Sequence, residues 1–270
     1  MKRSEKLYIE ETTSTNTWLL EYSRAAAPKT DNATEGLFTV YTFRQTAGRG
    51  QTGNGWESEP GKNLSFSTRF PIYSIELASR LNLLVPLAVV RMLDRYLPAE
   101  ELSIKWPNDV YWRDKKICGI LCENVLSGAD VRCAVAGIGV NVNQEVFLSG
   151  APNPVSMKNI TGCDYPLLTL LDETLDLFEE MFPLLNTPAQ LKQAYMERLY
   201  RRQGFYPYVE RVVSTAPTTL ASKNEKNEAG FAPFLAEIAD VDDFGRLVLR
   251  REDGVSHAYH FKEIRFILPC

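Results

Sequence analysis

Arg44–Ser67, with the sequence RQTAGRGQTGNGWESEPGKNLSFS, is the stretch of this 270-residue chain that decides its fold. Strand-like segments flank it, Leu37–Phe43 before and Leu64–Phe70 after. Glycine at this density allows positive φ and exposes backbone N–H groups to anion oxygens, and Arg49 adds a planar cation. The loop is therefore predicted either to bind a phosphate or carboxylate or to be a flexible hairpin connection. Its glycines are Gly48, Gly50, Gly53, Gly55 and Gly61.

Two familiar motifs match this region only formally. Gly48–Gly53 spells G-x-G-x-x-G, but the dinucleotide fingerprint needs a following helix, and here Pro60 and a strand follow. Asp243-Phe-Gly245 spells the kinase D-F-G, which requires an upstream His-Arg-Asp. Both histidines, His257 and His260, lie downstream of it. The Rossmann and kinase interpretations are therefore rejected.

Composition indicates an ordinary globular protein, with 44% hydrophobic and 24% charged residues and a net charge of −4. The acidic balance gives no global attraction for nucleic acid, and no apolar run reaches membrane-spanning length. The five cysteines contain no C-x-x-C pair, and Cys118 and Cys122 are predicted to be reduced core residues. We expect a cytoplasmic protein that binds neither nucleic acid nor membranes.

The first two hundred residues alternate between strand and helix patterns. The turn Thr12–Asn16 precedes a predicted helix over Thr17–Ala27, where it supplies a hydroxyl cap or a cluster of polar ligand contacts. A buried helix is predicted over Leu81–Leu97, with Pro86 in its first turns. Gln144–Cys163 is predicted to be a loop. Further helices are expected over Pro166–Leu185 and Thr187–Arg202.

A segment rich in polar residues at predicted strand ends lies between the helices predicted over Leu81–Leu97 and Pro166–Leu185. Val110–Trp112 and Ile117–Glu123 are expected to form a hairpin, and Val131–Val142 a further strand whose glycines permit close approach. A rigid sheet commonly supports functional side chains at such ends. The side chains in question are Lys105, Asn108, Asp109 and Lys116.

After Gly204 the pattern changes to short alternating strands and turns, which predicts a small β-barrel-like module. The expected domains are therefore residues 1–203 and 204–270. Pro217–Gly230 is predicted to be a loose surface loop, and His257 and His260 face opposite sides of a strand and cannot share a metal. The strands are expected over Phe205–Val213, Phe234–Asp240, Arg246–Arg251, His257–Phe261 and Arg265–Leu268.

Six motifs in order make the chain resemble the biotin protein ligases (biotin–[acetyl-CoA-carboxylase] ligases). They are Ser14-Thr15-Asn16, the Gly48–Trp56 loop, Gly61-x-Asn63-Leu64, Lys105-Trp-Pro-Asn-Asp109, Lys116-Ile-x-Gly119-Ile-Leu-x-Glu123 and Gly137-Ile-Gly139-x-Asn141-x-Asn143. The resemblance covers nearly the whole chain. It implies an α/β (α+β) fold, in which a mixed sheet backed by helices is joined to a small SH3-like C-terminal β-barrel domain.

The resemblance also implies two-step chemistry without an enzyme nucleophile. Biotin's carboxylate attacks the α-phosphorus of ATP, and a lysine of a biotin carboxyl carrier protein then attacks biotinyl-5′-adenylate. Catalysis must then rest on positioning and charge stabilisation. The implied catalytic residues are Lys116, Arg49, Asp109 and Lys105, and Mg²⁺ is expected to accompany ATP, near Asp109, rather than occupy a purely protein site.

Two sets of binding residues follow from the same resemblance. The biotin contacts are expected to be Ser14, Thr15, Asn16, Gln45, Gly48, Arg49, Lys116, Gly119, Gly137 and Gly139. The ATP and adenylate contacts are expected to be Arg49, Gly50, Gln51, Gly53, Trp56, Asn108, Asn141 and Asn143. For Trp56, bracing of the loop is the competing interpretation.

Some members of this family carry an N-terminal helix-turn-helix, for which this chain leaves no room before its catalytic pattern begins. A homodimer is possible on an exposed edge strand. The alternatives are a lipoate or octanoate ligase or transferase of the same fold, and a non-catalytic biotin sensor. One position departs from the family pattern: Gln51 stands where related ligases usually have a second arginine.

Overall fold

The structure, a computed structural model, describes residues 4–25, 36–51, 54–128, 130–151, 153–211 and 231–269. The chain divides into two compact units, Met1–Tyr200 and Arg201–Cys270. This division lies three residues before the boundary proposed from the sequence. Among the described residues, no helix has the length and apolar character needed to span a bilayer.

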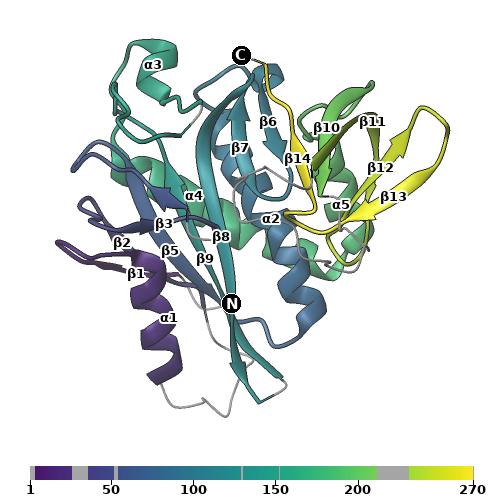
Figure 1. The fold of residues 1–270 in the computed structure, drawn as a ribbon. Coiled ribbons are helices and arrows are strands. Elements are labelled where there is room, and N and C mark those ends of the chain that lie inside the picture. Colours follow the sequence, from purple (N-terminus) through teal and green to yellow (C-terminus); the bar gives the residue numbers. More distant parts are fainter. Residues whose placement is uncertain are drawn as a thin grey trace, which may run out of the picture. The chain divides into compact units, whose positions relative to one another are not determined.

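A seven-stranded mixed sheet forms the centre of the first unit (Figure 1). Its strand order is β1-β2-β5-β9-β8-β7-β6; β1 pairs with β2 in parallel and all other neighbours are antiparallel. The predicted mixed sheet is thereby confirmed. The strands are β1 (Glu5–Tyr8), β2 (Phe38–Thr42), β5 (Leu64–Phe70), β6 (Leu102–Lys105), β7 (Asp109–Trp112), β8 (Lys115–Ser127) and β9 (Asp130–Val140), with a separate two-stranded ribbon of β3 (Gly48–Arg49) and β4 (Gly55–Trp56).

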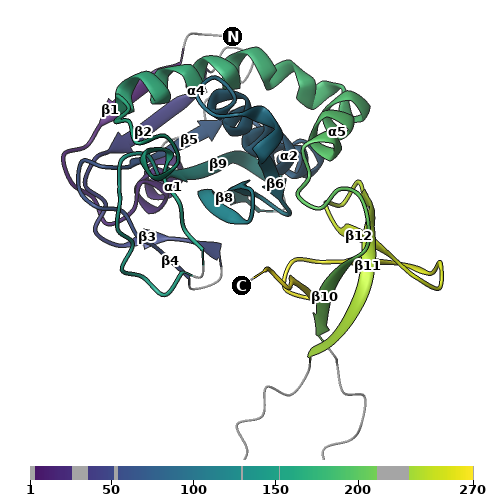
Figure 2. The same cartoon turned by 90° about the horizontal axis from the view of Figure 1, so that it is seen from above.

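Alternation along the strands gives this sheet two different faces. On one face, β5 contributes Phe66 and Phe70, whose rings pack on Phe178 of α4 at centroid distances of 6.4 and 5.3 Å. Figure 2 shows α2, α4 and α5 together on this side. The helices of the unit are α1 (Thr15–Ala25), α2 (Ile75–Leu93), α3 (Met157–Thr161), α4 (Leu167–Met181) and α5 (Pro188–Glu197).

The opposite face is apolar at one end only. There α1 packs Leu19 and Leu20 against Val40 of β2 and Val135 of β9. Further along the same face, β5 carries Ser65 and Ser67, β9 carries Gly137 and Gly139, and β8 carries Gly119, so most side chains there are small. This small-residue end is the candidate functional site.

Two predicted helices differ clearly from the observed ones. The helix expected over Leu81–Leu97 begins at Ile75, because Ser74 caps it by accepting a hydrogen bond from Leu77 N at 3.2 Å. Pro86 consequently lies in the helix interior rather than in its first turns. The predicted helix Pro166–Leu185 ends at Met181 and continues as a 3₁₀ turn over Phe182–Asn186. Pro183 explains this change, since proline cannot donate the α-helical hydrogen bond.

Other boundaries also shift. The segment predicted to be a loop, Gln144–Cys163, contains the short helix α3, whose N-terminus is fixed by a capping box between Ser156 and Asn159. α5 ends at Glu197 rather than Arg202, and α1 starts at Thr15 rather than Thr17. The earlier start places Thr15 and Asn16 inside the first helical turn.

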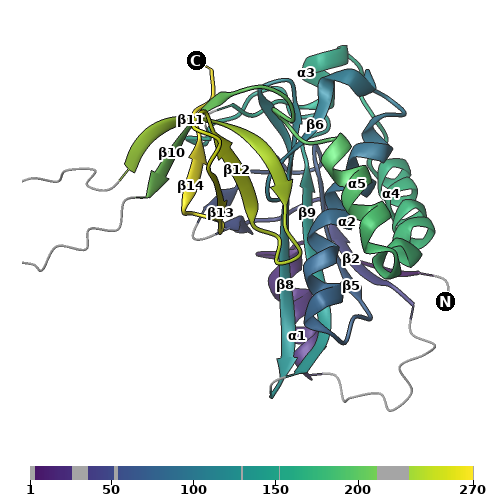
Figure 3. The ribbon, with the colours of Figure 1, turned by 90° about the vertical axis from the view of Figure 1, so that its right-hand side faces the viewer.

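The second unit is a five-stranded antiparallel sheet (Figure 3). Its order is β13-β12-β11-β10-β14, with a register irregularity between Ile238 and Asp240. A small β domain was predicted here and is found; its SH3-like character stays a prediction, and Pro217–Gly230 lies outside the described residues. The strands are β10 (Tyr206–Arg211), β11 (Phe231–Val241), β12 (Leu247–Arg251), β13 (Ser256–Tyr259) and β14 (Ile264–Phe266).

Phe178 provides a direct test of the helical layer. Its ring extends from α4 and is fully buried against β5, so Phe178→Ala should lower the free energy of unfolding by about 3–5 kcal/mol. All four tryptophans lie in the first unit, so urea unfolding followed by tryptophan fluorescence measures that unit. Leu168→Ala on the same helix is the control, because Leu168 is 45% exposed and should change stability by less than about 0.5 kcal/mol. Equal effects of the two substitutions would contradict this packing.

Candidate functional site

Three glycines and two serines make a flat surface at the small-residue end of the sheet. Gly139 of β9 is paired with Gly119 of β8 on one side and Ser65 of β5 on the other. Gly137 is likewise paired with Ser67 in the next row of the same face. We call this surface the glycine floor: Gly119, Gly137, Gly139, Ser65 and Ser67. Without side chains at the glycines, other groups can approach the backbone of the sheet directly.

The turn before α1 lies over one end of the floor. A Cβ at Gly137 would lie 2.8 Å from Asn16 Oδ1, so only glycine leaves room for this amide. Thr15 Oγ1 lies 2.9 Å from Ser67 Oγ, and Gln45 Oε1 accepts a hydrogen bond from Thr15 N at 3.0 Å. Thr15 and Asn16 are buried, so this polar cluster is a fixed part of the site.

Trp56 of β4 lies over the other end of the floor. A Cβ at Gly139 would approach its ring to 2.4 Å and one at Gly119 to 2.8 Å. The Lys116 ammonium lies 5.6 Å from the centre of the same ring. The glycine ribbon β3–β4 therefore reaches the sheet through a tryptophan that requires glycine beneath it.

Several buried polar atoms around the floor have no hydrogen-bond partner among the described residues. They include Asn16 Oδ1, Ser65 Oγ and Trp56 Nε1. Buried polar groups of folded proteins are nearly always satisfied, so a cluster of unsatisfied ones points to a polar ligand. The atoms present both acceptor and donor character: an amide oxygen, a hydroxyl and an indole N–H.

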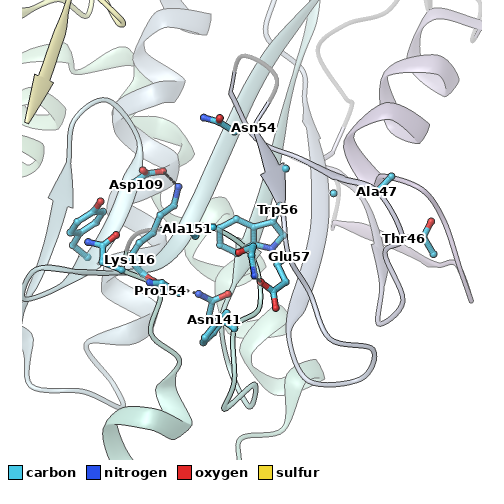
Figure 4. A pocket seen from close by; sticks show the side chains of 17 residues that line it. Thr46, Ala47, Asn54, Trp56, Glu57, Asp109, Lys116, Asn141, Ala151 and Pro154 are labelled. Atoms are coloured by element: carbon cyan, nitrogen blue, oxygen red, sulfur yellow. Dashed lines mark hydrogen bonds and ion pairs between the residues drawn. The ribbon is translucent and has the colours of Figure 1, made fainter. Parts of the chain in front are cut away.

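A cavity of about 690 Å³ adjoins the floor and is drawn in Figure 4. Its size suits a small organic ligand. Residues of the glycine ribbon line one side of it, the β7–β8 hairpin another, and residues 147–154 a third. The lining residues include Gly48, Trp56, Glu57, Asp109, Tyr111, Lys116, Asn141, Phe147, Ser149 and Pro154.

Lys116 and Asp109 form an ion pair inside this cavity, with Nζ 2.8 Å from Oδ1 (Figure 4). Their side chains are 30% and 24% exposed, so solvent screens the pair only in part. Tyr111 lines the same wall; burial, together with the Asp109 charge, raises the pKa of its hydroxyl. This wall of the cavity thus presents the Lys116 ammonium, its partner carboxylate Asp109 and the neutral phenol of Tyr111.

Arg49 forms a second and separate ion pair. Its guanidinium donates to both oxygens of Glu123, at 3.0 and 3.2 Å, and to Thr17 Oγ1 at 3.0 Å. Asn16 Nδ2 donates to the same carboxylate at 2.5 Å. Because Glu123 accepts from the amide nitrogen, the Asn16 oxygen is the atom left facing the floor.

The two cysteines of β8 near the site, Cys118 and Cys122, are not suited to nucleophilic attack. Burial raises the pKa of the Cys118 thiol, and that of Cys122 to about 12, so both are thiols at neutral pH. The described residues contain no cluster of three or more His, Cys, Asp or Glu placed to hold a metal. The site can bind and orient polar and anionic groups.

The structure brings together many of the residues expected from the sequence. Ser14, Thr15, Asn16, Gln45, Gly119, Gly137 and Gly139 gather at or beside the floor, and Gly48, Trp56, Asp109, Lys116 and Asn141 line the cavity. Gly53 lies outside the described residues. Gly50 donates its N–H to Asn54 O at 2.7 Å within the ribbon. Ligand contacts for all of them stay predictions.

Several expected residues do not line this cavity, including Gly50, Gln51 and four that have partners elsewhere. Asn108 donates to Ile120 O at 2.6 Å, and Asn143 exchanges two hydrogen bonds with the Tyr165 backbone. Both amides brace the fold. Lys105 lies over the Tyr111 ring at 5.4 Å, and Arg49 is paired with Glu123, so the expected convergence of three cations is not the arrangement observed.

The sequence analysis missed four residues that the structure adds. Ser65 and Ser67 were taken only as strand residues, although their alternation with Leu64 and Phe66 signalled a polar face. Glu123 belongs to a quoted motif but was given no role. Glu57 follows Trp56 and lines the cavity, and nothing in its sequence context distinguished it.

Comparison with known proteins agrees with this geometry. The model of the Biotin/lipoate A/B protein ligase family matches residues 8–141. The biotin–[acetyl-CoA-carboxylase] ligase of Paracoccus denitrificans is 31% identical over 239 residues, which are 86% of this chain and 92% of that protein. This chain belongs to the biotin protein ligase family. The family and fold expected from the sequence are thereby confirmed.

Two further relatives show the extent of the similarity. The bifunctional ligase/repressor BirA of Bacillus subtilis is 28% identical over 239 residues, and the match spans 66% of that protein's length. The biotin protein ligase of Aquifex aeolicus, solved in complex with biotin and ATP, has a TM-score of 0.70 and 22% identity, and the match covers 98% of this chain and 99% of that one. The latter likeness concerns the fold.

Gly139 tests the packing of Trp56. In Gly139→Ala the added Cβ would lie 2.4 Å from the indole, so the ring must leave the floor. We expect acrylamide to quench Trp56 fluorescence more strongly, with the Trp56 signal isolated by comparison with matched Trp56→Phe variants. Gly150→Ala is the control, since no atom lies within 4 Å of its added Cβ. Unaltered quenching in Gly139→Ala would refute the contact.

Proposed function

We propose that this protein is an ATP-dependent ligase that joins biotin to a lysine of a biotin carboxyl carrier protein. An oxygen of the biotin carboxylate attacks the α-phosphorus of ATP, forming biotinyl-5′-adenylate and releasing pyrophosphate. The lysine amine then attacks the carbonyl carbon, forms an amide, loses a proton and releases AMP. Membership of the biotin protein ligase family supports this reaction, and so do the names of the relatives above.

The observation that carries the proposal is the glycine floor with its unsatisfied polar atoms beside a cationic cavity. Biotin's ureido ring has two N–H donors and one carbonyl acceptor. Asn16 Oδ1 and Ser65 Oγ can accept from the N–H groups, while hydroxyls and the Gln45 amide can donate to the carbonyl. Gly119, Gly137 and Gly139 leave space for a flat ring against the sheet, provided that the Trp56 ring moves away from Gly119 and Gly139.

Lys116 is proposed to bind the reacting anions. Biotin carboxylate and the α-phosphate repel one another, and a cation between them offsets that repulsion as the new bond forms. Asp109 holds Lys116 at 2.8 Å and so aims it into the cavity. In the second step, Asp109 is proposed to accept the proton of the acceptor lysine.

Arg49 and Lys105 are proposed to assist the reaction from positions outside the cavity lining. Arg49 is 44% exposed in its pair with Glu123, so an incoming phosphate or carboxylate can replace Glu123 without a large desolvation cost. Mg²⁺ is proposed to arrive with ATP. Among the described residues Asp109 and Glu57 are the carboxylates that line the cavity, and Asp109 is the one beside the proposed phosphate site.

The basic experiment follows biotin-dependent pyrophosphate release and labelling of a carrier domain. Biotin with ATP should support both. Lipoate in place of biotin should support neither, because it lacks N–H donors for Asn16 and Ser65. Turnover with lipoate alone would favour the lipoate ligase alternative, and biotin binding without pyrophosphate release would favour a sensor.

Lys116→Met should abolish adenylate formation. The lost charge-assisted hydrogen bond contributes about 1.5–3 kcal/mol, which corresponds to roughly ten- to hundredfold weaker anion binding, and the effect on the transition state should be larger. The measurement is single-turnover pyrophosphate release. Lys115→Met is a matched control, since Lys115 is the adjacent, exposed lysine of β8. Near-normal release by Lys116→Met would remove Lys116 from the mechanism.

Gln51 is proposed to weaken retention of the intermediate. Its Oε1 is buried without a hydrogen-bond partner among the described residues, and Arg44 is engaged by Glu11 at 2.7 Å rather than replacing the missing arginine. A neutral hydrogen bond contributes about 1 kcal/mol less than a charged one, so Gln51→Arg should release preformed biotinyl-adenylate roughly fivefold more slowly. Stopped-flow dissociation without carrier measures this rate. Equal or slower release by the native protein would show that Gln51 is compensated.

A further inference from the structure

Glu57 connects two walls of the cavity. It follows Trp56 directly, and its carboxylate accepts hydrogen bonds from two consecutive backbone N–H groups across the cavity. Leu148 N lies 2.9 Å from Oε1, and Ser149 N lies 2.6 Å from Oε2. Gln144 Nε2 donates to Oε1 at 2.9 Å. One carboxylate thus joins the stretch Arg44–Ser67, which we call the glycine segment, to residues 144–151, which we call the rim loop.

Gln144 strengthens this connection from the opposite side. It is only 2% exposed, and its Oε1 accepts from Glu59 N at 3.0 Å and from Asn63 Nδ2 at 2.5 Å. Asn63 in turn accepts from Val142 N at 3.0 Å. The base of the rim loop is therefore fixed by buried amides, while its tip depends on Glu57.

Apart from those to Glu57, one hydrogen bond among the described residues reaches the tip of the rim loop: Gln144 Nε2 donates to Val146 O at 2.9 Å. No backbone–backbone hydrogen bond involves residues 146–151 within the described part of the chain, and Val146 and Leu148 are 66% and 88% exposed. Apolar burial therefore does not fix the loop, although Phe147, Ser149, Gly150 and Ala151 line the cavity. Segments with few buried contacts open at low free-energy cost unless a specific interaction holds them.

We propose that Glu57 is a positioning residue that latches the rim loop to the glycine segment and thereby sets how long the activated intermediate stays in the cavity. This inference rests on the proposed ligase function. Trp56 and Glu57 are adjacent, so the residue covering the floor and the residue closing the rim are held by the same short stretch of backbone (Figure 4). In this proposal the latch acts on the rim loop and not on the reacting atoms. It should govern retention rather than bond formation.

The ionised state of Glu57 suits this role. Burial alone would raise its pKa, but the hydrogen bonds from Leu148, Ser149 and Gln144 outweigh that effect, and the pKa lies below its ordinary value. A carboxyl whose pKa is lowered on folding contributes stability above its unfolded pKa and loses it as pH falls through the folded value. The latch is therefore closed throughout the neutral range and opens only at acid pH.

Hydrogen exchange tests the latch without any ligand. In Glu57→Gln the amide keeps one oxygen acceptor and loses the charge, so one of the Leu148 and Ser149 N–H groups loses its acceptor. We expect exchange in residues 146–151 to accelerate at least about fivefold, the ratio that separates a charged from a neutral hydrogen bond. Glu59→Gln is the matched control: it makes the same charge change two residues away, at an exposed side chain. Unchanged exchange in Glu57→Gln would overturn the latch.

Release of the intermediate tests its consequence. Preformed biotinyl-adenylate should leave Glu57→Gln at least about threefold faster than the native protein or Glu59→Gln, while first-turnover pyrophosphate release stays within about twofold. Faster rim exchange with unchanged release would show a latch with no effect on the cavity and would overturn the inference. Faster exchange over the whole sheet, with a lower urea midpoint, would show general destabilisation and would overturn it too.

The two possible failures remain distinguishable. If the native protein makes no biotinyl-adenylate, the proposed function fails, whereas rim exchange still reports on the latch. If the native protein makes the adenylate and Glu57→Gln retains it equally well, the latch fails and the ligase function stands.

Discussion

The whole site depends on the absence of side chains at one end of a sheet face. Gly119, Gly137 and Gly139 are adjacent on β8 and β9, and each would place a Cβ within 2.8 Å of Asn16 or Trp56. Elsewhere on that face, Val40 and Val135 pack against α1 and close the surface. A single sheet thus provides both a hydrophobic core and the candidate binding surface, because side-chain size changes along its strands.

Electrostatics organises the same region through two separated ion pairs. Lys116 with Asp109 and Arg49 with Glu123 each keep a cation in place while neutralising its charge. In such an arrangement an incoming anion competes with a carboxylate rather than with water alone. In the proposed reaction, positioned cations of this kind would lower the cost of bringing biotin carboxylate and ATP together without an enzyme nucleophile. Glu123 also accepts a hydrogen bond from the Asn16 amide. The same carboxylate therefore positions both the Arg49 guanidinium and the Asn16 oxygen that faces the floor.

Much of the fold was accessible from the sequence because local patterns and tertiary structure agreed. Alternating residues in Leu64–Phe70 and the hairpin around 113–115 have strand periodicity, and the change after Gly204 separated a β module within three residues of the observed division. Errors occurred where one side chain overrode a pattern. Ser74 moved the start of α2, Pro183 ended α4, and the Ser156–Asn159 capping box created α3 inside a predicted loop. Single caps and breakers shift boundaries without altering periodicity.

The sequence by itself determined the family, the mixed sheet and most of the residues that gather at the floor. These could be identified because the glycines and the motif residues occur in a recognisable order along the chain. Only the tertiary structure decided their partners. Arg49 with Glu123, Lys116 with Asp109, and Glu57 with the Leu148 and Ser149 amides join segments that are 74, 7 and about 91 residues apart. The Lys116–Asp109 pair forms across the β7–β8 hairpin, whereas the other two depend on distances between segments that are not neighbours in sequence. Local propensity carries no information about those distances, because they are set by how the helices and the glycine ribbon pack on the sheet.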